Sequence, residues 1–145
     1  MSLETWKAEF YPCEADSKEA QKDPILHSLR KWYGLRWENL FRHGLMLRGR
    51  LLVSEQASTL TYDECLEIDG DTCALCRRFH QLFCCDDPDL GVCPLRTVSG
   101  GNNCDYDEHQ PWSVFCNTGN PEPMIAALRM ALDMHRREQE GGLWE

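Results

Sequence analysis

Apolar residues recur at helical spacing in two parts of the chain, and these parts give its clearest predicted helices. The first covers residues 24–34, with Asp23 as the capping residue and Pro24 at the first helical position. Its apolar positions lie three or four residues apart: Ile25, Leu26, Leu29, Trp32 and Tyr33. Gly34 ends the pattern, so we predict a helix that stops there.

The second helical pattern lies near the C-terminus. It begins at Asn120 or in the turn 121–123 and ends before Gly141 and Gly142. One face collects its apolar residues: Met124, Ile125, Leu128 and Leu132. We expect this helix to close the core.

A shorter helix is predicted over residues 35–43. In this helix Leu40 and Phe41 should point inward, and Trp37 should lie near the contact with the preceding helix. Gly44 should end the helix in a left-handed backbone conformation. It should pack closely against the helix before it.

Weaker patterns follow. Alternating apolar positions predict one strand over residues 45–53. Thr61 and Glu64 have the spacing of a capping box, which predicts a short helix that runs to Asp69. The interpretation is therefore an α-rich α+β fold, in which helices surround an irregular cysteine-rich loop region.

The N-terminal residues are polar and mixed in charge. We expect an irregular arm over residues 1–22, anchored by Trp6, Phe10 and Tyr11, and one globular domain over residues 23–140. A chain of 145 residues is long enough for one core and short for two.

Composition restricts the setting. Of all residues 42% are hydrophobic, which suits a folded protein, and no window approaches the roughly 18 apolar residues of a membrane span. The first residues have no apolar stretch of the signal-peptide type, so we expect a cytoplasmic protein without membrane contact. In a reducing compartment nine cysteines favour metal ligation or buried thiols over disulfides.

Six cysteines gather in residues 73–104, which form the predicted metal-binding subregion: Cys73, Cys76, Cys84, Cys85, Cys93 and Cys104. Cys73 and Cys76 have the two-residue spacing that lets two thiolates face one ion before a helix. The preferred ligand set is Cys73, Cys76, Cys93 and Cys104, and Cys84 or Cys85 is an alternative for one of them.

Four thiolates favour a closed, structural zinc site, since a filled tetrahedral shell leaves no position for substrate. An iron-sulfur cluster is the alternative cofactor, because four cysteines also hold one. The alternative to a metal site is that several of these cysteines are ordinary buried thiols.

Several short strings support a resemblance. They are CALCRRFH from Cys73 onward, CPL from Cys93 onward, PEPMIAAL in the last helix, and KWYGLRWENLFRHGL upstream. With them, residues 25 to 135 resemble uncharacterised small cysteine-rich proteins of tailed bacteriophages. The doubled Cys84 and Cys85 depart from that pattern and leave the third ligand open. The resemblance implies a phage product that acts in a bacterial host cytoplasm, without a settled activity.

The charges are unevenly distributed within a net charge of -9. Residues 27–50 contain six basic residues against Glu38 alone, whereas residues 51–110 contain twelve acidic residues against three arginines. Aromatic residues lie within the basic segment, which makes nucleic acid a candidate partner for residues 27–50. The negative net charge of the whole protein opposes its approach to nucleic acid, so another partner is favoured.

We therefore expect a protein that binds a host macromolecule, namely a host protein that it inhibits or modulates. Candidate partner-binding residues come from both charged segments: Asp86, Asp87, Asp89, Arg30, Lys31 and Arg36. The enzyme alternative is a zinc-braced nuclease that uses His109 and Asn117. A redox role of the Cys73 and Cys76 pair has similar standing.

Overall fold

A computed structural model describes residues 2–54, 65–69, 72–79, 86–87, 91–98 and 109–141. The helices are α1 (Leu3–Phe10), α2 (Lys18–Lys22), α3 (Pro24–Gly34), α4 (Trp37–Arg42), α5 (Ala74–Phe79), α6 (Pro94–Val98), α7 (Pro111–Thr118) and α8 (Glu122–Gly141). The strands are β1 (Leu45–Arg48), β2 (Leu51–Ser54), β3 (Cys65–Glu67), β4 (Asp86–Asp87) and β5 (Gly91–Val92).

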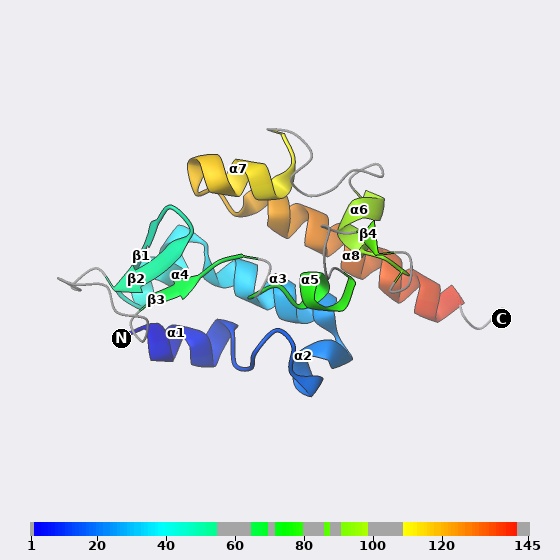
Figure 1. The fold of residues 1–145 in the computed structure, drawn as a ribbon, viewed down its shortest axis with the longest axis horizontal. Helices are drawn as coiled ribbons and strands as arrows, with labels where there is room; N and C mark the ends of the chain where they lie inside the picture. Colours follow the sequence, from blue (N-terminus) through cyan, green and yellow to red (C-terminus); the bar gives the residue numbers. More distant parts are fainter. Residues whose placement is uncertain are drawn as a thin grey trace.

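Helices α3 and α8 form the centre of the fold (Figure 1). Helix α1 and then α5 pack on α3, whereas α6 and α7 pack on α8. Strands β1, β2 and β3 form an antiparallel sheet in that order. The sheet lies at one end of the molecule, where α4 packs on β1 (Figure 1). The expected α-rich α+β class is confirmed.

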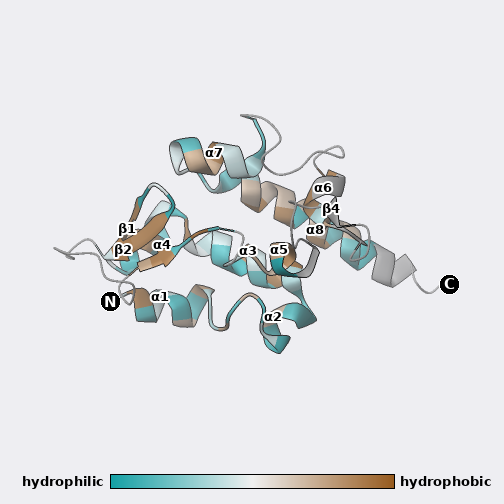
Figure 2. Cartoon of the chain, in the orientation of Figure 1, coloured by the Kyte–Doolittle hydropathy of each residue, from teal (hydrophilic) through white to brown (hydrophobic). Residues whose placement is uncertain are grey.

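One continuous core joins these elements. Its members come from the sheet and from α1, α3, α4, α5, α6, α7 and α8. The largest fully buried side chains include Trp6, Tyr11, Phe115, Leu75 and Leu128. Figure 2 shows the apolar colour concentrated in β2, α5 and the first half of α8, while α2 is mainly polar. The expected apolar face of the last helix is confirmed, because Met124, Ile125, Leu128 and Leu132 are all buried.

The expectation of an irregular N-terminal arm over residues 1–22 is wrong. Ser2 and Thr5 form a reciprocal capping box, in which each side chain accepts the backbone N–H of the other residue, and this starts α1. Ser17 caps α2 through the N–H of Ala20. Neither short helix was predicted, because this segment is mainly polar and has no long apolar repeat. The three predicted anchors, Trp6, Phe10 and Tyr11, are buried.

Helix α3 follows the prediction closely. Asp23 accepts the N–H of Leu26 at 3.0 Å, Pro24 is the first residue and Gly34 is the last. Helix α4 is also present, and Gly44 has the predicted left-handed φ of +67°. The predicted orientation of its aromatic residues is wrong, because Trp37 is 73% exposed and Phe41 65% exposed, and only Leu40 points into the core.

The predicted single strand over residues 45–53 is a hairpin of β1 and β2. Gly49 adopts a left-handed φ of +62° in the turn, which reverses the chain and pairs Arg48 with Leu51. The helix predicted up to Asp69 is wrong over residues 65–67, because these form β3 and pair with β2. Its capping residues Thr61 and Glu64 lie outside the described residues.

Gly34 allows the closest approach of α1 to α3. A Cβ atom added there would lie 2.5 Å from Cγ of Phe10. We therefore expect Gly34→Ala to lower the free energy of unfolding by about 1–3 kcal/mol, although alanine has the better helix propensity. Chemical denaturation would measure this loss. If the clash is its cause, Phe10→Leu should cost less in the Gly34→Ala background than in the wild type, and equal costs would contradict the explanation.

Candidate thiol and metal site

Cys73 and Cys76 lie at the start of α5 as a pair. The backbone N–H of Cys76 points to Sγ of Cys73 at 3.3 Å, and Oγ of Ser28 on α3 lies 3.9 Å from the same sulfur. Cys73 is a half-buried free thiol. The turn thus directs the Cys76 N–H at the sulfur of Cys73, which favours its thiolate form.

Lys31 of α3 lies buried beside this pair. Only 1% of the residue is exposed, and its Nζ donates a hydrogen bond to the carbonyl oxygen of Thr72 at 2.7 Å. Burial lowers the pKa of Lys31, while the neighbouring sulfurs of Cys73 and Cys76 oppose that shift. A buried ammonium requires compensating negative charge, and thiolates supply it.

The pKa of Cys73 is lowered to about 6. The hydrogen bond with the Cys76 side chain is the largest cause, and the charge of Lys31, the Cys76 N–H and Ser28 act in the same direction against the effect of burial. These contacts therefore favour the thiolate form of Cys73. A thiolate is the form that binds metals and that attacks disulfides.

Hydrogen bonds fix the loop that carries this pair. Oγ1 of Thr72 accepts the N–H of Asp69 at 3.0 Å and lies 3.1 Å from the carbonyl oxygen of Glu67. From the opposite side, Nε2 of Gln21 donates to the carbonyl oxygens of Ala15 and Ala74 at 2.8 and 3.0 Å. The start of α5 is thus tied to β3, to α2 and to α3.

The rest of the predicted ligand set is not assembled by the described residues. Cys93 is buried in the core before α6. Cys84, Cys85 and Cys104 lie outside the described residues. Across the described ranges, no three His, Cys, Asp or Glu residues are grouped so that they could hold a metal ion, so Cys93 does not join the pair in such a group. The zinc set stays a prediction beyond the pair itself.

The three basic residues predicted to bind a partner differ in their burial and in their contacts. The prediction that Lys31 contacts a partner is wrong, because Lys31 is buried where α5 packs on α3. Arg36 forms two hydrogen bonds with the carboxylate of Glu122, and Nε of Arg30 donates to the carbonyl oxygen of Glu9.

The acidic residues of that prediction are only partly described. Asp86 and Asp87 form β4, whose backbone alone is described, and Asp89 lies outside the described residues. Of the predicted nuclease residues, His109 and Asn117 are exposed, and Asn117 lies on α7. The nuclease hypothesis stays a prediction.

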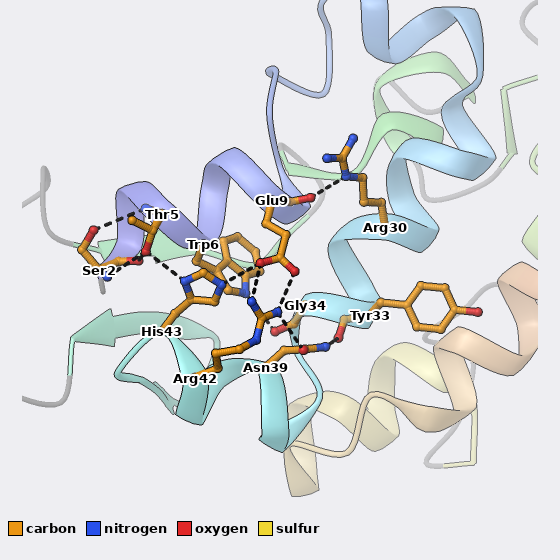
Figure 3. Close-up of polar contacts among 10 residues, drawn as sticks. All are labelled: Ser2, Thr5, Trp6, Glu9, Arg30, Tyr33, Gly34, Asn39, Arg42 and His43. Atoms are coloured by element: carbon orange, nitrogen blue, oxygen red, sulfur yellow. Dashed lines mark hydrogen bonds and ion pairs between the residues drawn. The ribbon is translucent and has the colours of Figure 1, made fainter.

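A polar cluster that the sequence did not predict joins α1 to α4 (Figure 3). Arg42 donates two hydrogen bonds to the carboxylate of Glu9, at 2.7 and 2.6 Å, and Nε2 of the buried His43 lies 3.0 Å from the same group. Nδ1 of His43 lies 2.9 Å from Oγ1 of Thr5. These residues are more than thirty positions apart in the chain, so no local spacing indicated the contact.

This cluster predicts a dependence of stability on pH. Arg42, and after it His43, lower the pKa of Glu9 from 4.5 to about 2. The charged carboxylate therefore stabilises the fold above pH 4.5, and this contribution is lost as pH falls towards 2. We expect the stability difference between wild type and Glu9→Gln to shrink over that interval in urea titrations. Glu4→Gln, on the same helix, is the control, and a difference independent of pH would contradict the assignment.

Two exposed aromatic side chains form a surface feature on α4. The rings of Trp37 and Phe41 are stacked, with centroids 5.3 Å apart and an interplanar angle of 21°. Both are more than half exposed. Exposed aromatic side chains of this size are typical anchors of protein interfaces.

No helix within the described ranges is long and apolar enough to cross a bilayer. Comparison of the chain with protein families, with curated proteins and with solved structures found no match.

Proposed function

We propose that the protein is a zinc-stabilised binding protein, in which Cys73 and Cys76 provide half of a structural metal site. The turn that brings Cys73 and Cys76 together at the start of α5 carries this proposal. Two thiolates in a turn that leads into a helix are the usual first half of a tetrahedral zinc site. The remaining ligands are proposed among Cys84, Cys85 and Cys104, which lie outside the described residues.

The electrostatics of the pair agree with a structural ion. A zinc ion would supply two positive charges at a site where two sulfurs lie beside the buried Lys31. The metal would hold the loop that carries Cys73 on α3, where the core around Leu75 is continuous with that of the helices. Iron-sulfur ligation uses the same thiolates, so metal identity is part of the test.

Binding of a macromolecule is the proposed activity, with a host protein as the partner. Support comes from the exposed pair of Trp37 and Phe41, and from the acidic sequence around Asp86, Asp87 and Asp89. The resemblance to small phage proteins supports a bacterial host. Nucleic acid is the less favoured partner of residues 27–50, because Arg36 and Arg42 are both engaged by carboxylates of the protein itself.

Affinity capture from bacterial lysate tests this activity and separates the two surfaces. The purified, metal-loaded chain would be compared with Trp37→Ser/Phe41→Ser, with Asp86→Lys/Asp87→Lys/Asp89→Lys, and with Met130→Ser. Met130 is 54% exposed on α8 and serves as the matched apolar control. We expect one surface variant to lose a specific protein that the control retains. Capture of the same proteins by all variants would contradict both surfaces.

A dithiol redox function is the second candidate, because a pKa of about 6 also suits a nucleophilic cysteine. In that function the Cys73 thiolate attacks a substrate disulfide and releases one substrate thiolate. The deprotonated sulfur of Cys76 then attacks Sγ of Cys73 in the mixed disulfide and releases the second substrate thiolate, so that a Cys73 to Cys76 disulfide forms and the substrate disulfide is reduced to two thiols. Equilibration with glutathione buffers measures it. A Cys73 to Cys76 disulfide formed at a potential near that of cytosolic dithiols would favour this function over zinc binding.

A further inference from the structure

Residues 16–22, here called the strap, lie against the start of α5 between two anchored ends. At the first end, the N–H of Ala15 donates to the hydroxyl oxygen of the buried Tyr11 at 3.1 Å. At the second end, Asp23 caps α3 through the N–H of Leu26. The strap contains α2, which packs on both α3 and α5. It is therefore a short segment hinged between two fixed residues.

Small side chains and one amide hold the strap on α5. Ala20 forms a buried cluster with Ala15 and with Ala74 of α5. Nε2 of Gln21 donates to the carbonyl oxygens of Ala15 and Ala74, at 2.8 and 3.0 Å. Because both carbonyls can only accept, the amide of Gln21 is the donor that joins the two segments.

These contacts bury little apolar surface. Within the strap only Ala20 is buried, and its side chain is a single methyl group. The contact of Asp16 with Arg77 of α5, at 3.2 Å, joins side chains that are 60% and 41% exposed, so solvent weakens it. Figure 2 shows α2 as mainly polar. A segment with so little apolar packing opens at a lower free energy than a core helix such as α3.

The strap covers the first turn of α5, where the thiol pair lies. Ala74 stands between Cys73 and Cys76, and its side chain is completely buried in the cluster with the strap. Its carbonyl oxygen is also the one that Gln21 binds. On the other side of the turn, Sγ of Cys73 lies 3.9 Å from Oγ of Ser28 on α3. The turn that pairs the two sulfurs is thus held between the strap and α3.

We propose that the strap opens while the core stays folded, and that its opening controls the access of reagents and substrates to Cys73 and Cys76. The closed strap holds the first turn of α5 against α3 and keeps Cys73 half-buried. The open strap uncovers this turn, so both thiols react faster. This regulation concerns the thiol pair of the proposed function, but it does not require a bound ion. Elemental analysis can therefore refute the zinc site without refuting the strap.

Hydrogen exchange of the full chain tests whether the strap opens by itself. The backbone N–H groups of Ala20 and Gln21 both donate to Ser17, so their exchange reports on α2. We expect their protection factors to be at least about tenfold lower than those in the middle of α3. Protection equal to that of α3 would mean that the strap opens only when the whole protein unfolds, and would overturn the proposal.

A variant then tests the control of the thiols. Gln21→Glu keeps the size of the side chain but removes the amide donor. We expect Cys73 and Cys76 to react with iodoacetamide at least about tenfold faster than in the wild type, relative to the exposed Cys116 of the same sample. Peptide mass spectrometry would separate the three cysteines.

Lys22→Gln is the matched control. Lys22 is paired with Glu19 on the outer surface of α2, where both side chains are at least 70% exposed, and we expect it to react as the wild type does. A bound ion would slow alkylation in all three proteins, so the ratios between them are compared. Unchanged alkylation in Gln21→Glu, or faster alkylation with an equal loss of hydrogen-exchange protection in α8, would overturn the proposal.

Discussion

Cys73→Ser should abolish binding of the proposed zinc ion and unfold the part of the chain around α5. Structural zinc in small domains contributes on the order of 10 kcal/mol, and a serine hydroxyl at neutral pH does not replace a thiolate ligand. Hydrogen exchange of the metal-loaded protein should show lost protection over residues 65–79, while α8 keeps its protection through its contacts with α3 and α7. Elemental analysis of the same samples should show the loss of zinc.

Cys116→Ser is the matched control for this experiment. Cys116 is an exposed cysteine on α7, outside the predicted ligand set. We expect its zinc content and its exchange pattern to equal those of the wild type. If Cys73→Ser behaved like this control, the sulfur of Cys73 would have no part in a metal site.

Trp6→Ala should cause the largest loss of stability in the metal-independent part of the fold. The indole is completely buried, and its Nε1–H donates to the carbonyl oxygen of Gly34 at 2.8 Å. Truncation of a buried Trp typically costs about 3–5 kcal/mol, and here it also leaves that carbonyl without its donor. Denaturant titration should show this loss, because α1 is held on α3 mainly by Trp6 and Phe10.

Trp37→Ala gives the comparison with the same chemical change at an exposed site. Trp37 contacts Phe41 on the surface of α4, so we expect a loss of less than about 1 kcal/mol. Similar losses in both variants would contradict the placement of Trp6 in the core.

Local signals explain which elements were predictable. Asp23, Pro24 and Gly34 define both ends of α3 within a few residues, and the apolar face of α8 repeats over several turns. Short helices such as α2 give no such repeat and depend on a single capping residue, Ser17. The hairpin was missed because alternation continues through the turn at Gly49, and only the backbone conformation of that glycine shows the reversal.

The candidate site was predictable only in part for a similar reason. Sequence spacing identified Cys73 and Cys76 as a pair, since both lie in one turn. It could not identify Lys31 or Ser28 as neighbours, because the packing of α5 on α3 brings them together across more than forty residues. The sequence predicted Lys31 as part of a charged surface, whereas tertiary packing buries it beside the sulfurs of Cys73 and Cys76.

Native mass spectrometry of the freshly purified, reduced chain, combined with elemental analysis, would show whether Cys73 and Cys76 hold a zinc ion. We expect one zinc ion per chain, with Cys73 and Cys76 protected from alkylation until a chelator is added. A folded chain without metal, in which both cysteines react at once or are joined by a disulfide, would contradict it.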